Sequence, residues 1–234
     1  MTNFGEHYNE ELAQQEKVVN KRTLWEIVGA FIVLTAIWGL AFGQFPMVNA
    51  IVFSITYGIS ALFFIAALLM FFKMNLSDER VKNFFVVTIC VISAAMNLIF
   101  SYHMVLLYVL PMIAAIQYKD KSVLWMSYAL EVFLMPLSMI AGFYYGICDL
   151  NLLLQGNHTK SWYLFNMVDG FAQIPMNKIP VAVIIVYRVI PQLLVLLAFT
   201  IITQYTIGNM QEEAYKIAEL TYRKEVDSAT RLYN

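Results

Sequence analysis

The chain has 234 residues, of which 60% are hydrophobic and 13% are charged, and its formal net charge is −1. Soluble globular proteins carry about 25% charged residues, so this composition excludes an ordinary soluble domain and indicates an integral membrane protein. Cys90 and Cys148 are too few for a disulfide framework, and we expect both to be free thiols. Because the first 23 residues are polar and the first apolar run is long, we expect no cleavable signal peptide.

Five apolar runs follow the polar N-terminal segment 1–23, and that segment is expected to form a frayed or surface-lying helix. A helix needs about 20 residues to cross a bilayer core. We therefore predict an all-α, polytopic membrane bundle with a long outer loop at 148–180. Its six spans are expected at residues 24–43, 47–72, 84–102, 104–118, 122–147 and 181–205.

The run 84–118 is the ambiguous one, because it is too long for one span and barely long enough for two. Polar residues cluster near its middle at Asn97, Ser101, Tyr102 and His103. They favour a tight hairpin of two short spans, with Pro111 kinking the returning helix. One span followed by a re-entrant segment is the alternative.

The basic residues predict the orientation, because short loops rich in Lys and Arg stay in the cytoplasm. With both termini inside, the outer face keeps only Lys160 and Lys178, and Arg188 lies within a span. The cytoplasmic side then receives Lys17, Lys21, Arg22, Lys73, Arg80, Lys82, Lys119, Lys121, Lys216, Arg223, Lys224 and Arg231.

Ionisable residues inside spans are the first candidate sites. Glu131 lies near the middle of the fifth span, where a carboxyl group is costly and is expected to face the bundle interior. It is interpreted either as a ligand contact or proton-sensing group, or as a structural hydrogen bond. Arg188 lies near the outer end of the sixth span, with Gln192 one turn further on, and it could reach toward Glu131 or extend to the headgroups.

Residues at the outer face give weaker candidates. His103 and Asn97 are read as polar interfacial residues, although a histidine also permits pH sensing. The sequence offers no local cluster of metal ligands, so no metal site is predicted. Residues of the outer loop, namely Asp149, Trp162, Tyr163 and Asp169, form either a lid over a pocket or an interfacial aromatic belt.

A charged helix is predicted at 206–226, directly after the sixth span. Its apolar residues have the alternating spacing of three and four of a two-stranded coiled coil, and fall at Ile207, Met210, Ala214, Ile217 and Thr221. The pattern predicts either a homodimeric seam or a helix that packs on its own protein. Glu212 and Lys216, like Glu219 and Arg223, are acid-before-base pairs four residues apart, which favour a helix.

The last eight residues, DSATRLYN at 227–234, carry a family resemblance. They resemble the entry motif of GGDEF (diguanylate cyclase) domains, commonly D-x-L-T-G-L-x-N-R, through Asp227, Thr230, Leu232 and Asn234. Ala229 stands where Leu is usual and Arg231 where Gly is usual. In that family the motif follows a signalling helix, as it does here.

The resemblance implies a sensory and transmitting region in a bacterial inner membrane, placed before a cyclase domain that condenses two GTP into cyclic di-GMP with Mg²⁺. Asn234 matches the Asn that contacts guanine. The GG(D/E)EF signature is absent from these residues, so they are expected to be non-catalytic and to bind no cofactor themselves. The expected partners are the lipid bilayer, a second copy and an unknown stimulus, and no nucleic acid. Alternatives are a small transporter or channel subunit, or the sensor region of another output such as a kinase.

Overall fold

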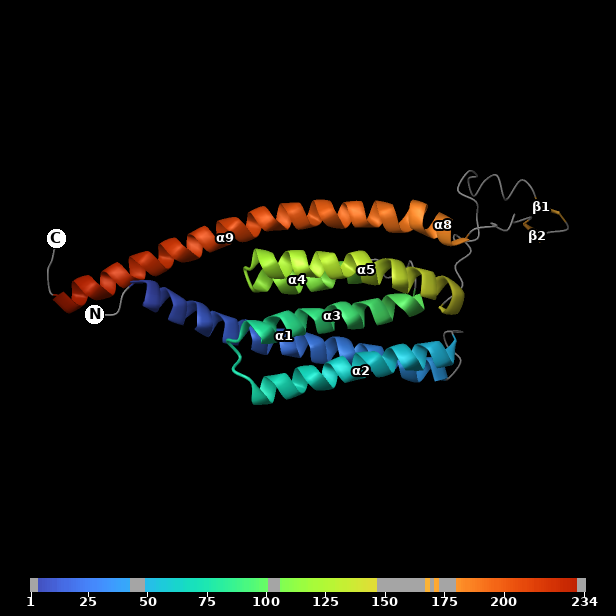
Figure 1. The fold of residues 1–234 in the computed structure, drawn as a ribbon, viewed down its shortest axis with the longest axis horizontal. Helices are drawn as coiled ribbons and strands as arrows, with labels where there is room; N and C mark the ends of the chain where they lie inside the picture. The colour runs from blue at the N-terminus through green and yellow to red at the C-terminus, as the bar shows by residue number, and fades with distance from the viewer. Residues whose placement is uncertain are drawn as a thin grey trace.

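The computed structural model describes residues 4–42, 49–100, 106–146, 167–168, 171–172 and 180–230. Nearly all of these residues are helical, so the predicted helical bundle is confirmed (Figure 1). The helices are α1 (Phe4–Phe42), α2 (Ala50–Lys73), α3 (Glu79–Phe100), α4 (Leu110–Gln117), α5 (Lys121–Tyr145), α8 (Pro180–Ile184), η2 (Ile185–Val189) and α9 (Ile190–Thr230). The strands β1 (Met167–Val168) and β2 (Phe171–Ala172) form a two-residue antiparallel ladder.

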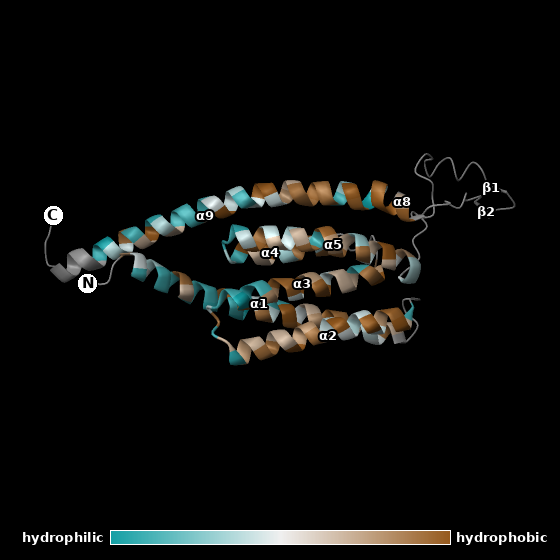
Figure 2. Ribbon diagram, viewed as in Figure 1, coloured by the Kyte–Doolittle hydropathy of each residue, from teal (hydrophilic) through white to brown (hydrophobic). Residues whose placement is uncertain are grey.

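Five of the described helices, α1, α2, α3, α5 and the continuous η2–α9 helix, are long and apolar enough to cross a membrane. Helix α3 is central and packs against α1, α2, α4 and α5. By contrast, α2 exposes Ile51, Leu62 and Phe72 along its length. Exposed aliphatic and aromatic side chains on an outer helix match a lipid environment, and Figure 2 shows the hydrophobic colouring concentrated in the bundle.

The N-terminal part of α1 and the C-terminal part of α9 project beyond the other helices at one end of the bundle, here named the terminal end (Figure 1). Residues 4–23 were predicted as a separate frayed or surface helix. They instead continue without a break into the first span, as one helix of 39 residues. The two projecting segments are hydrophilic, as the colouring in Figure 2 shows.

The α3–α4 region resembles a hairpin with one short arm. Helix α4 has 8 residues and follows a short turn at 106–109, so the apolar helical stretch Leu106–Gln117 stays below the about 20 residues of a full span. The expected kink at Pro111 is wrong. Pro111 lies in the first turn of α4. Backbone N–H groups in the first turn have no partner within the helix, so proline removes no hydrogen bond there.

Local geometry accounts for two of the helix boundaries. Asp120 caps α5 by accepting a hydrogen bond of 2.8 Å from the Ser122 N–H. At the far end of α5, Gly146 lies so close to α3 that a Cβ atom would sit 2.3 Å from the Leu98 carbonyl oxygen. Only glycine permits that approach.

Candidate functional site

Glu131 lies on the buried face of α5, together with Ser127, Met135 and Ser138. Its side chain is 0% exposed, and neither carboxyl oxygen has a hydrogen-bond partner among the described residues. The thiol of Cys90 on α3, which is free as expected, lies beside the carboxyl group. An apolar interior strongly disfavours an ionised carboxylate whose neighbouring donor is only a weak thiol, so this position favours the uncharged acid.

The hypothesis that Glu131 pairs with Arg188 fails on helix register. The Trp125 indole Nε1 donates a 2.6 Å hydrogen bond to Gln204 Oε1, and Gly208 lies against the end of the Lys121 side chain. These contacts align α5 and α9 antiparallel and bring Glu131 level with Ala198. At a rise of about 1.5 Å per residue, Arg188 is displaced by roughly 15 Å along the helix, which exceeds the reach of its side chain.

Arg188 lies in η2, the π-helical segment at the start of the sixth span, and makes an interaction of its own. Pro191 follows directly. Proline lacks an N–H and clashes with the carbonyl four residues back, and the wider π turn accommodates this conflict. The Oε1 atom of nearby Gln192 is buried and has no hydrogen-bond partner within the part of the chain that the structure describes.

Asn97 was predicted near an interfacial hairpin tip, but the structure buries it fully within α3. Its amide nitrogen donates to Tyr108 Oη and, at 3.4 Å, to Ser138 Oγ. The Tyr108 hydroxyl lies 2.6 Å from the same Ser138 Oγ. This polar triad joins α3, the turn before α4, and α5.

Tyr108 and Ser138 were missed by the sequence reasoning. Ser138 lies seven residues after Glu131, hence two helical turns along the same face, and that spacing is the signal that could have identified it. Tyr108 offered no comparable pattern.

A second polar cluster, which the sequence did not predict either, lies at the terminal end of the bundle. The Lys82 ammonium group, 8% exposed, forms ion pairs of 3.0 Å with Glu16 of α1 and 2.7 Å with Asp120 at the start of α5. Burial alone would raise the pKa of the Asp120 carboxyl, but hydrogen bonds from Lys82 and the Ser122 backbone hold that pKa below its ordinary value. The cluster therefore ties α1, α3 and α5 together.

Hydrogen bonds extend this cluster on both sides. Asn20 of α1 donates to the Leu76 carbonyl at 2.6 Å and accepts from the Tyr118 hydroxyl at 2.7 Å. Lys119 adopts a left-handed backbone conformation with φ of 52°, and its carbonyl accepts a 2.6 Å bond from Gln211 of α9. The turn between α4 and α5 thus contacts both projecting helices.

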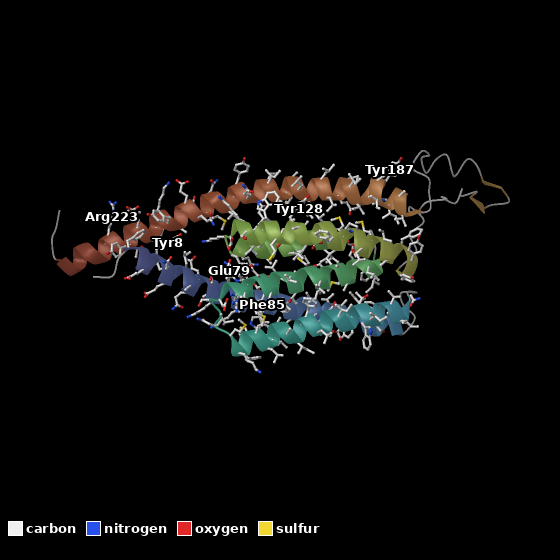
Figure 3. The ribbon with its side chains drawn as sticks, viewed as in Figure 1. Tyr8, Glu79, Phe85, Tyr128, Tyr187 and Arg223 are labelled. Carbon is white, nitrogen blue, oxygen red and sulfur yellow. The ribbon has the colours of Figure 1, made fainter. Side chains whose placement is uncertain are left out.

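The projecting parts of α1 and α9 pack on each other through aromatic rings. Phe4 contacts Tyr215 and Tyr222 with ring centroids 5.4 and 5.5 Å apart, and Tyr8 contacts Tyr215 at 5.5 Å. Figure 3 shows Tyr8 on the side of α1 that approaches α9. Grooves of 640 and 920 Å³ flank this line of contact.

The remaining predicted site residues fall mostly outside the described residues. His103, Asp149, Trp162, Tyr163, Asp169, Leu232 and Asn234 all belong there. Asp227 and Thr230 lie within the last turns of α9. Among the residues that the structure describes, there is no group of three His, Cys, Asp or Glu side chains that could hold a metal ion.

Comparison with models of known protein families, with curated proteins and with solved structures finds no match for this chain.

Proposed function

We propose that this chain is the membrane-embedded sensory and transmitting region of a signalling protein whose output is a GGDEF-type diguanylate cyclase domain. The observation that supports this most is the continuity of α9. One helix of 41 residues runs from the membrane bundle to Thr230, inside the segment that resembles the GGDEF entry motif. A rigid rod of this length can carry a displacement of the sixth span to whatever follows it.

The proposal places both termini in the cytoplasm of a bacterial cell, beneath the inner membrane. The side chains of the Lys82 cluster and the basic residues of both projecting helices lie at the terminal end, which agrees with the preference of Lys and Arg for the cytoplasmic side. GTP and Mg²⁺ would be bound by the downstream domain, with Asn234 contributing to guanine recognition by family resemblance.

The proposed mechanism is a shift between two states of the bundle. A stimulus changes their populations only if it binds one state better than the other. The shifted sixth span would then alter how two signalling helices, from two copies of the chain, present their cyclase domains to each other. Buried polar groups such as Glu131, which has only the Cys90 thiol as a donor among the described residues, are the places where a stimulus could act on the bundle.

The direct test is the coding sequence after Asn234. We expect an Arg codon next and a GG(D/E)EF signature within the following domain. A stop codon in place of this signature contradicts the cyclase proposal.

A functional test fuses residues 1–234 to an active GGDEF domain and measures cyclic di-GMP in cells without other cyclases. Inserting two residues between Lys224 and Glu225 rotates the output by about 200°, whereas inserting seven returns it to within about 20°. We expect the first insertion to change the output strongly and the second to preserve it. Equal output from both argues against transmission through the helix.

A further inference from the structure

The signalling helix has one covered face and one open face. Ile207 is 0% and Ala218 is 3% exposed, whereas Ile217 is 65% and Leu220 is 67% exposed. Ile207 and Ile217 both belong to the coiled-coil seam that the sequence predicts for a second copy. Part of that seam is therefore already packed within a single chain.

Ile207 is packed in a hydrophobic cluster of the bundle, whereas the projecting part of α1 lies against α9 further along the helix. The Phe4 and Tyr8 rings of α1 pack on Tyr215 and Tyr222 of α9 at centroid separations of 5.4 to 5.5 Å. Aromatic pairs of this geometry each favour the packed state by roughly two- to twelvefold beyond the effect of the area they bury. The contact is consequently strong enough to define a preferred state and weak enough to open.

We propose that residues 4–16 of α1 form an intramolecular clasp, which competes with a second copy of the chain for the signalling helix. The proposal rests on the dimeric output proposed above. In a two-stranded coiled coil, every seam residue faces the partner helix. A helix packed at the usual 8–10 Å on one side excludes a second helix from the same side. Tyr215 and Tyr222 directly follow the seam positions Ala214 and Thr221, so the closed clasp flanks the seam on one side, while Ile217 on the other side stays open.

Both helical segments of the clasp are connected without a break to membrane spans. Helix α1 is continuous from Phe4 to Phe42, and η2–α9 is continuous from the opposite end of the bundle to Thr230. The two clasp segments are thus direct extensions of the first and last spans. A change in the angle between these spans is amplified along both projecting segments. Grooves of 640 and 920 Å³ lie beside the contact, so the two segments are not closely packed along their whole length.

Disulfide cross-linking of the full chain in membrane vesicles tests the proposal. Single cysteines are introduced at Ala214→Cys and Ala218→Cys, on or beside the covered face, and at Ile217→Cys on the open face. The background carries Cys148→Ser and keeps the buried Cys90, and the same chain without an added cysteine serves as the blank. The fraction of covalent dimer is read on a non-reducing gel.

The clasp is opened by Phe4→Ser with Tyr8→Ser, and independently by deleting residues 2–12, which leaves the first span intact. Asn9→Ser, an exposed position on the same helix, is the matched control. We expect opening to increase dimer cross-linking by about tenfold or more at Ala214→Cys and Ala218→Cys, as the loss of three aromatic pairs would give. Cross-linking at Ile217→Cys should also rise, because this seam residue reports the same dimer, and Asn9→Ser should change nothing.

Two results overturn the clasp. If Ala214→Cys and Ala218→Cys cross-link equally with the clasp intact and opened, no competition exists, while the dimeric transmitter remains supported. If no position cross-links in any variant, the clasp and the dimer both fail. The cyclase output itself is decided separately, by the sequence after Asn234 and by the fusion protein.

Discussion

Trp125 and Gln204 are joined by a 2.6 Å hydrogen bond from the indole Nε1 to the amide oxygen, and this contact defines how α5 aligns with α9. The alignment separates Glu131 from Arg188 and gives the sixth span its position against the bundle. The bond therefore matters mainly because it sets the register of α5 against α9, although its contribution to the free energy of unfolding is modest.

Replacing Trp125 by Phe should remove this bond and keep most of the apolar contact. Hydrogen bonds between membrane helices contribute about 0.6 kcal/mol on average and at most about 1.7 kcal/mol. We expect a loss of that size in the free energy of unfolding, measured by denaturant titration in detergent. The Trp25→Phe variant serves as control because Trp25 is largely exposed. Equal effects of the two substitutions would contradict the assignment.

The Tyr108→Phe variant tests the triad of Asn97, Tyr108 and Ser138. The phenyl ring retains the packing of Tyr108, while Asn97 and Ser138 lose a buried partner. We expect destabilisation of about 1–2 kcal/mol, at the upper end for membrane hydrogen bonds because all three residues are buried. Tyr144→Phe, at an exposed tyrosine of α5, should leave the unfolding midpoint unchanged.

Lys82→Met should leave Glu16 and Asp120 facing each other without their shared cation. Breaking a fully buried ion pair costs about 3–5 kcal/mol. Both carboxylates here keep some solvent contact, so we expect a smaller loss, of roughly 2 kcal/mol. The exposed Lys73→Met is the matched substitution. A change below about 0.5 kcal/mol in Lys82→Met would show that the cluster does not hold the terminal end together.

Because of the Lys82 cluster, we expect the stability of the folded protein to depend on pH in the acidic range. The pKa of Asp120 is lowered in the folded protein from its ordinary 3.8, so its contribution to stability is complete above that pH. It is lost as the pH falls through the lowered folded pKa. We expect the thermal midpoint to fall below pH 4, and Asp120→Asn to show a shallower fall over the same range. Identical pH profiles would exclude Asp120 as the source.

Glu131→Gln should be close to neutral for folding. A buried carboxyl group beside only a weak thiol donor is expected to be uncharged, and an amide of nearly the same shape replaces it. We expect a change within about 1 kcal/mol in the free energy of unfolding, whereas Glu131→Lys places a cation in the same apolar site and should lower the yield of inserted protein. A large loss in Glu131→Gln would show that the ionised carboxylate is stabilised by a partner.

The membrane helices were predictable because apolar length alone determines them. The runs at 47–72 and 122–147 closely match α2 and α5, since any uninterrupted apolar run of that length must satisfy its backbone hydrogen bonds within a helix. The short α4 was harder to predict, because its length depends on a turn at 106–109 that no single residue type indicates.

The contacts between helices were not predictable in the same way. Lys82 reads as an ordinary residue at the edge of a span, and its partners Glu16 and Asp120 lie 66 and 38 positions away. Asn97 was placed at an interface because the register of α3 against α5 could not be known. The contact of Phe4 with Tyr222 connects nearly the whole chain, and periodicity within one helix says nothing about such a neighbour.

The π turn at Ile185–Val189 gives the last span one extra residue compared with a regular α-helical path. Conversion of that turn to α-helical geometry would have to turn everything after it by about 100° and advance it by about 1.5 Å. The 41 residues of α9 would make this screw motion as one body. A rearrangement of a few backbone hydrogen bonds at one end of the bundle would therefore rotate Thr230 about the helix axis at the other end.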